Sequence, residues 1–425
     1  MWQKLEQIWK TPDLRNNILF ILGALVVFRL AAHLPIPGVD TSALRNFFSS
    51  NQLLGLLNLF SGGGLENFSV VMLGVGPYIT SSIIIQLLTM IVPRLEEISK
   101  DGEAGQRRIN QYTRWLTVPL AALQAYSFIM LLRGQGGTRL LGEFDTMKLV
   151  TSLVTITAGT IFLMWLGELM SERKVGNGVS LLIFAGIVAG LPQHLQQFIA
   201  TFDSSQLFPA IGFLAVALVT VVGVVVVTEA QRNVPVNYAR MVRGPRTFGG
   251  ANTFLPLRLL QAGVIPIIFA ISVILFPPMI AQFFIKSATV WLVRAAEFTI
   301  TLFQNQIFYG LAYFVLVFGF TYFYTAVIFK PDQIAENLQK HGGFVPGIRP
   351  GKSTTDYLND TMNKIILPGA LFLGLIAVLP LTLRAITGSQ LLVIGGTSLL
   401  IVVSVVIETV RQINAQLVMR DYDEL

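Results

Sequence analysis

The chain has 425 residues, of which 53% are hydrophobic and only 12% are charged, and its net charge is +7. Soluble domains carry about 25% charged residues, so this composition excludes an ordinary soluble protein and indicates one that spans a membrane. The absence of cysteine excludes disulfides and thiolate metal sites, and the three histidines lie in separate segments, which does not suggest a metal-ligand cluster.

Ten segments are long and apolar enough to form membrane-spanning helices. In chain order they cover residues 17–34, 69–92, 115–133, 149–170, 179–199, 208–229, 255–285, 307–329, 364–383 and 391–411. The first follows basic residues, as a signal peptide would, but no clear small-residue cleavage site precedes Pro35, so we interpret it as a retained helix. The predicted fold class is therefore an all-α polytopic membrane protein with ten transmembrane helices.

The distribution of Lys and Arg predicts the orientation of these helices. Of the 30 Lys and Arg residues, 22 lie in one set of alternate segments, which includes both termini, and 7 lie in the other set, while Arg29 lies within the first span. Loops on the cytoplasmic side carry the excess of basic residues. Both termini and the loops 230–258 and 330–364 are therefore predicted to be cytoplasmic.

Ten spans divide into five and five, and an odd number in each half makes the two halves insert in opposite senses. This is the arrangement of an inverted repeat, which is typical of proteins with a path between two halves. We predict two inverted five-helix halves, residues 1–205 and 206–425. No internal sequence identity supports the repeat, which rests on topology alone.

The apolar stretch 56–68, between the first two spans, is interrupted by Gly62-Gly63-Gly64. Glycine costs roughly 1 kcal/mol in a helix interior, so three in a row indicate a break or a hinge. Such backbone cannot face lipid and must be buried in protein or line a cavity. Two interpretations stay open: an outer loop packed on the helix bundle, or a short movable helix in the mouth of a pore.

Later spans contain similar breaks. Segment 255–285 is expected to be one helix with Gly263 and Pro266 in its middle, and Pro77 interrupts the second span. Proline removes a backbone hydrogen bond and bends a helix. Kinked helices suit a bundle that opens, although static bundles contain them too.

The spans carry no set of residues suited to catalysis. Glu168 and Glu229 lie at predicted cytoplasmic ends, and mid-membrane positions hold almost no Asp or Glu. Ion-coupled transporters usually bind their ion with such a group, so its absence weighs against coupled transport. A nucleophile–base pair is also lacking, and we expect no catalytic residues, no metal and no cofactor.

One loop, residues 343–354, reads GFVPGIRPGKST and superficially matches a phosphate-binding loop. A phosphate-binding loop needs four residues between its two glycines, but in this chain only three residues separate Gly347 from Gly351. Pro346 and Pro350 also have no N–H to offer a phosphate. We therefore do not expect this loop to bind a nucleotide. Arg349, which lies between the two prolines, needs another role.

Several long stretches match one family, in order along essentially the whole chain. They are DGEAG (101–105), INQYTRW (109–115), GNGVSLLIFAGIVAGLP (176–192), AGVIPIIFA (262–270), FVPGIRPG (344–351) and GGTSLLIVV (395–403). The sequence resembles the SecY family, the channel subunits of the bacterial protein-secretion translocon. The resemblance implies a central hourglass pore that passes unfolded secretory proteins across the cytoplasmic membrane and releases transmembrane segments sideways into lipid.

The resemblance implies a ring of aliphatic side chains at the mid-membrane constriction. The matching positions are Val75, Ile79, Ile187, Ile268 and Ile401, with Ile183 nearby. Val75 departs from the isoleucine that is commoner at its position. Branched alkyl groups can exclude water and seal around a passing chain without reading its sequence, although spacing alone would favour ordinary core or lipid-facing packing for each of them.

The resemblance also implies a plug and a lateral gate. The plug would be the glycine-broken segment and would leave the outer funnel when a chain enters; its residues would be Gly62, Gly63, Gly64, Leu65, Glu66, Asn67 and Phe68. The gate would lie between the helix from Val75 onward and the helix from Leu255 to Phe276. Thr80, Ser81, Gln124 and Ser272 would lie on or near this seam.

The basic loops are assigned partners by the same resemblance, namely the SecA motor ATPase and the translating ribosome with its rRNA. The docking residues would be Arg349 and Lys352 on one loop and Arg240, Arg243 and Arg246 on the other. Two prolines stiffen the loop around Arg349, which lowers its ordering cost on binding. Further expected partners are the small membrane subunits SecE and SecG, preproteins with signal sequences, and membrane lipid. The competing functions are a secondary transporter of a small solute and a scaffold without transport.

Overall fold

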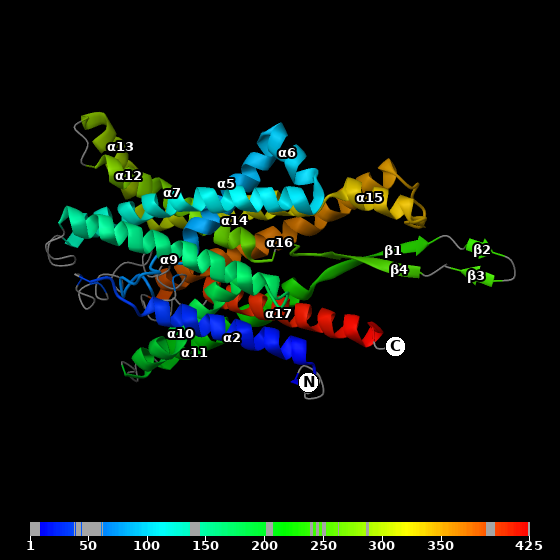
Figure 1. Cartoon of the computed structure of the whole chain (residues 1–425), viewed down its shortest axis with the longest axis horizontal. Coiled ribbons are helices and arrows are strands. Elements are labelled where there is room, and N and C mark those ends of the chain that lie inside the picture. Colours follow the sequence, from blue (N-terminus) through cyan, green and yellow to red (C-terminus); the bar gives the residue numbers. More distant parts are fainter. Residues whose placement is uncertain are drawn as a thin grey trace. The chain divides into compact units, whose positions relative to one another are not determined.

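The structure is a computed structural model that describes residues 9–37, 39, 44, 61, 63–136, 145–200, 207–238, 241–243, 246–248, 252–261, 263–285, 289–387 and 396–423. Helices dominate the chain (Figure 1). They are α2 (Pro12–Ala32), α5 (Gly76–Ile91), α6 (Pro93–Lys100), α7 (Gly102–Gly136), α9 (Thr146–Glu172), α10 (Gly178–Ala200), α11 (Leu207–Glu229), α12 (Ile265–Phe284), α13 (Val290–Gln304), α14 (Gln306–Ile328), α15 (Pro331–Lys340), α16 (Lys352–Thr387) and α17 (Gly396–Asp423). The strands are β1 (Gln231–Tyr238), β2 (Met241–Arg243), β3 (Arg246–Phe248), β4 (Asn252–Arg258) and β5 (Gly343–Phe344).

Each of the ten predicted spans has an apolar helix in the described part of the chain. Six helices are long and apolar enough to cross a membrane: α2, α7, α9, α14, α16 and α17. α5 passes this test only together with α6, from which it is bent by 102°. The remaining three, α10, α11 and α12, are shorter apolar helices over their described residues. The membrane-embedded part is therefore all-α and polytopic, as the sequence predicts.

Proline marks the start of several helices. α2, α6 and α15 begin at Pro12, Pro93 and Pro331, and Pro77 is the second residue of α5. Proline suits the first helical turn because the N–H that it lacks would have no partner there. The expected break at Pro77 is thus the beginning of a helix, and the residues before Gly76 form turns instead of extending the span back to residue 69.

Segment 255–285 is not a single helix, and this corrects the expectation from sequence. Leu255 lies in β4, and α12 begins only at Ile265. Gly263 has a φ of +58°, a left-handed conformation that favours glycine, and Pro266 lies in the first turn of α12. The residues expected to bend the middle of a helix instead form the entry to one.

A small β-sheet lies in the segment 230–258, which the sequence analysis described only as a cytoplasmic loop. β1 pairs antiparallel with β4, from Gln231 opposite Arg258 to Asn237 opposite Asn252, and the end of β1 also pairs with β5. The strand order is β4-β1-β5, and β2 and β3 form a separate two-stranded pair. The β1–β4 pair therefore ties the start of this loop to its end.

The chain divides into two compact units. The first comprises residues 1–204, 272–305 and 405–425, and the second comprises residues 205–271 and 306–404. In the first unit α7 packs against both α5 and α9, and α9 also packs against α10. In the second unit α14 packs along α16, where Gly374 lets the ring of Phe314 approach the α16 backbone. Because the first unit combines the predicted N-terminal half with two later segments, the division at residue 205 stays a prediction.

Candidate functional site

The six predicted ring residues are all described, and none is more than 8% exposed. Val75 caps the start of α5, and its carbonyl accepts a hydrogen bond from the N–H of Ile79 one turn later (3.0 Å). Ile183 and Ile187 lie one turn apart on α10, so they share a helix face. These four residues belong to the first unit, while Ile268 of α12 and Ile401 of α17 belong to the second. Their closure into one ring stays a prediction.

Over its described residues, 61 and 63–75, the glycine-broken region forms turns and one isolated bridge and not a regular helix; we call these residues the turn segment. Its backbone is hydrogen-bonded to the residues that follow α2. The N–H of Ile36 donates to the carbonyl of Phe68 (2.9 Å), and the N–H of Val70 donates to the carbonyl of Leu34 (3.0 Å). These bonds flank an isolated antiparallel bridge between Pro35 and Ser69. Gly62 lies outside the described residues.

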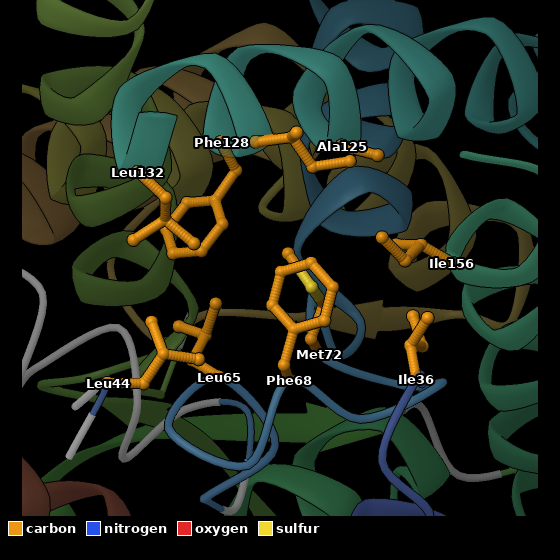
Figure 2. Close-up of a cluster of buried hydrophobic side chains, with 10 residues drawn as sticks. Ile36, Leu44, Leu65, Phe68, Met72, Ala125, Phe128, Leu132 and Ile156 are labelled. Atoms are coloured by element: carbon orange, nitrogen blue, oxygen red, sulfur yellow. The ribbon is translucent and has the colours of Figure 1, made fainter. Parts of the chain in front are cut away.

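Two side chains of the turn segment anchor it in a hydrophobic cluster. Phe68 is fully buried and Leu65 is 3% exposed. Figure 2 shows both side chains pointing toward Phe128 and Leu132 of α7. The other buried members of the cluster are Ile36, Leu44, Met72, Ala125, Ile129 and Ile156. The segment is therefore packed on α7 and α9 in this structure, which is what either open interpretation, a packed outer loop or a closed plug, requires.

Backbone geometry explains why glycine is needed in this segment. A Cβ on Gly64 would lie 2.9 Å from the Ser69 hydroxyl oxygen and 3.1 Å from the carbonyl of Ser61, so a side chain there would force the turn apart. Gly63 has a φ of +81°, which glycine adopts without strain. Phe68 has a φ of +45°, a conformation that costs a non-glycine residue about 1–3 kcal/mol. The burial of its ring opposes this strain.

Opposite charges also meet at the turn segment. Glu66 Oε1 and Arg29 Nη1 both lie within 4 Å of the point where a Cβ on Gly63 would sit, and Glu66 acts electrostatically on Arg29. The structure brings the Arg29 guanidinium to the turn segment, a placement that its position within the first span did not predict. The segment is thus held by backbone bonds, apolar burial and charge.

The predicted docking loop around Arg349 is fastened on both sides. Val345 is 3% exposed and belongs to the core of the second unit, and the N–H of Ile348 donates to its carbonyl (3.0 Å). The Thr354 hydroxyl donates to the carbonyl of Arg349 (2.9 Å), close to the start of α16. The side chains of Arg349 and Lys352 are both exposed. The loop therefore presents two cations on a backbone that is fixed at its base.

The structure describes only part of the second predicted docking loop, which carries Arg240, Arg243 and Arg246. Arg243 of β2 and Arg246 of β3 lie opposite each other in the pairing register, at the turn of the hairpin. Arg240 lies outside the described residues. The β2–β3 pair places two of the three arginines opposite each other at one end of a β-ribbon.

Comparisons with known proteins identify relatives of this chain. A family model described as SecY matches residues 69–410. The protein translocase subunit SecY of Streptomyces scabiei is 42% identical over 443 aligned residues, which cover 100% of this chain and 99% of that protein. The same subunit of Mycobacterium bovis is also 42% identical, with 97% of each chain covered.

The chain belongs to the SecY family. Among solved structures, a protein-conducting channel has a TM-score of 0.63 at 15% identity and covers 93% of this chain and 91% of that one. Sec61 from a canine ribosome–channel complex has a TM-score of 0.62 at 15% identity, with 93% and 91% covered. At these identities the likeness establishes the fold.

The predicted gate residues of this SecY-family chain lie on three helices. Ser81 of α5 is buried, and its hydroxyl donates to the carbonyl of Thr113 in α7 (2.6 Å). Thr80 donates to the carbonyl of Gly76 in its own helix (3.1 Å). Gln124 of α7 and Ser272 of α12 are half-buried. The Ser81 hydroxyl is therefore engaged within the first unit, and the gate assignment of these residues stays a prediction.

An ion pair between α7 and α9 was not predicted from the sequence. Arg114 Nε lies 2.8 Å from Glu168 Oε1 and links α7 to α9. The stretch INQYTRW, used above for the resemblance, contains this arginine, but nothing in its spacing indicates a partner 54 residues away. Among the residues that the structure describes, no group of three or more His, Cys, Asp or Glu could hold a metal ion.

Proposed function

We propose that this chain is the protein-conducting channel subunit of a bacterial Sec translocase. It passes unfolded secretory proteins across the membrane and releases transmembrane segments into lipid. The observation that carries the proposal is 42% identity to protein translocase subunits along the whole chain. The buried aliphatic side chains at the six ring positions, from Val75 to Ile401, are of the type that a hydrophobic seal needs.

The turn segment acts as the plug of this channel, closing the outer funnel at rest and leaving it when a substrate chain enters. Three features support a closed resting position: the burial of Phe68 and Leu65, the backbone bonds to the end of α2, and the charge of Glu66 near Arg29. One solved relative is a SecY protein whose plug domain stabilises the closed channel and maintains a membrane seal. In our proposal this segment has the same role.

The lateral gate lies between α5 and α12, whose apolar side chains suit contact with signal sequences and lipid. The structure revises its second side, because the helix begins at Ile265 and not at Leu255. Thr80, Ser81, Gln124 and Ser272 supply polar groups on or near these helices. Polar seam residues would keep the closed gate from packing too tightly.

The basic loops dock the partners. The fixed loop that carries Arg349 and Lys352 would bind SecA, and the arginines of the β2–β3 hairpin would bind SecA or ribosomal RNA phosphates. A ribosome–channel complex among the solved relatives supports a ribosome partner. SecE and SecG complete the assembly. The chain lies in the bacterial cytoplasmic membrane with both termini in the cytoplasm, as the excess of Lys and Arg in alternate segments indicates.

Reconstitution tests the function directly. The purified chain, with the two small subunits, is placed in lipid vesicles and supplied with SecA, ATP and an unfolded precursor. We expect the precursor to become protected from added protease inside the vesicles, and a precursor without its signal sequence serves as the control. Uptake of a small solute driven by a proton or sodium gradient, without protection of precursor, would favour the secondary transporter instead.

A further inference from the structure

The short helix α13 (Val290–Gln304) lies between two apolar helices and has no role in the channel function proposed above. It has 15 residues, which is too short to span a hydrocarbon core that needs about 20. A single residue, Asn305, separates α13 from α14, and α12 ends at Phe284. Its covalent neighbours therefore keep α13 at the end of two membrane-embedded helices, on the side opposite to the basic loops.

Two stripes of different chemistry run along the exposed side of α13. Trp291, Ala295, Phe298 and Leu302 fall within an arc of about 60° at 3.6 residues per turn. Trp291 is 73% exposed and Phe298 is 68% exposed. The adjoining arc of about 60° holds Arg294, Glu297 and Thr301, with Val290 at the start of the helix, and all four are exposed. Large aromatic side chains thus stand beside a cation and an anion on one uncovered surface.

The helices on either side of α13 in the chain also carry exposed apolar side chains. Phe284 at the end of α12 is 40% exposed, and Leu311 and Val315 of α14 are 65% and 58% exposed. Exposed apolar residues on membrane-spanning helices suit contact with lipid. The hydroxyl of Thr299 donates to the Ala295 carbonyl in the same helix (2.8 Å), so this polar group needs no water.

We propose that α13 lies in the plane of the membrane–water interface and that its apolar stripe binds the phospholipid bilayer. Trp291 and Phe298 would enter the boundary between headgroups and acyl chains, where tryptophan is enriched. Arg294 would remain at the level of the lipid phosphates, and Glu297 and Thr301 would face water. Helices of this kind insert their apolar side about 5–10 Å below the headgroups. The proposal adds a lipid contact to the channel and does not depend on its substrate.

The absence of cysteine from the chain makes a clean test available. Ala295→Cys and Thr301→Cys introduce a single reactive site on the apolar and polar stripes, and both leave Trp291 and Phe298 in place. Each variant of the full chain is labelled with an environment-sensitive fluorophore. It is then reconstituted into vesicles of phosphatidylcholine and phosphatidylglycerol that contain a minor fraction of spin-labelled lipid.

We expect the label at position 295 to be quenched several-fold more by spin-labelled lipid, and several-fold less by aqueous iodide, than the label at position 301. Adding Trp291→Ser and Phe298→Ser to the Ala295→Cys chain should abolish this difference. Equal quenching at the two positions would overturn the proposal. So would a label at 295 that iodide cannot reach and spin-labelled lipid does not quench, because protein would then cover the stripe.

Discussion

Truncating Phe68 to alanine tests whether the turn segment is a plug. The ring is fully buried among Leu65, Met72 and Phe128 in the cluster beneath α7. Truncating a buried phenylalanine costs about 3–5 kcal/mol. Alanine has a Cβ and keeps the left-handed backbone cost of this position, so the loss of packing should dominate the change. The substitution should therefore destabilise the docked segment relative to the undocked one.

The expected effect on the channel follows from this magnitude. Each 1.4 kcal/mol changes an equilibrium tenfold, so the ratio of undocked to docked segment should rise by about 10² to 10⁴. The measurement is the resting ion conductance of the reconstituted channel in a planar bilayer, without precursor and without SecA. Phe68→Ala should raise this conductance strongly, because an undocked plug leaves the outer funnel open.

Two variants serve as controls. Phe68→Leu keeps most of the buried volume and should lie close to wild type. Asn67→Ala changes the adjacent half-buried polar residue, which is not a member of the cluster, and should change the conductance far less. If Phe68→Ala keeps its helix content by circular dichroism and its conductance matches wild type, the segment is a packed outer loop and the plug assignment is wrong.

Three further predictions concern the pore ring, the charge near Arg29 and the docking loop. Ile401→Asn should hydrate the buried constriction, raising the resting ion leak and the translocation of precursors with defective signal sequences; wild-type levels of both would remove Ile401 from the seal. Glu66→Gln removes the charge near Arg29 and should raise the resting conductance a few-fold, since such pairs contribute on the order of 1 kcal/mol, whereas no change would show that the charge does not hold the segment. Arg349→Glu should severely impair SecA-driven translocation, with Arg349→Lys intermediate if paired hydrogen bonds matter, and Lys352→Ala should be mild. Loss concentrated at Lys352, or tight ATP binding by the purified chain alone, would instead favour a nucleotide loop.

The spanning helices were predictable because the bilayer restricts what a chain can do. Backbone polar groups in hydrocarbon must be satisfied within the segment, so a long apolar run becomes a helix whatever its tertiary neighbours are. The argument against a phosphate-binding loop at 343–354 is also local. It rests on the spacing of Gly347 and Gly351 and on the N–H groups that the two prolines lack. Local chemistry was also sufficient to predict a break at the three glycines.

Local signals were weaker where two structures compete for the same residues. Segment 255–285 was predicted to be one helix because apolar residues predominate in it. In the structure its start pairs with β1, and the left-handed backbone of Gly263 separates β4 from α12. Strand pairing joins residues that are distant in sequence, so no periodicity within 255–285 could reveal it. The β2–β3 hairpin pairs residues close in sequence, such as Arg243 with Arg246, and the sequence analysis identified this segment only as part of a basic loop.

The sequence by itself determined the class of the protein, its apolar helices and the family stretches that pointed to SecY. Only the tertiary structure decided that Phe68 packs beneath α7, that Arg29 approaches Glu66, and that the Ser81 hydroxyl is engaged by the α7 backbone. The physical reason is that helix formation in a membrane depends on each segment's own composition. Packing between segments depends instead on the shape and charge of side chains that the fold brings together from distant positions.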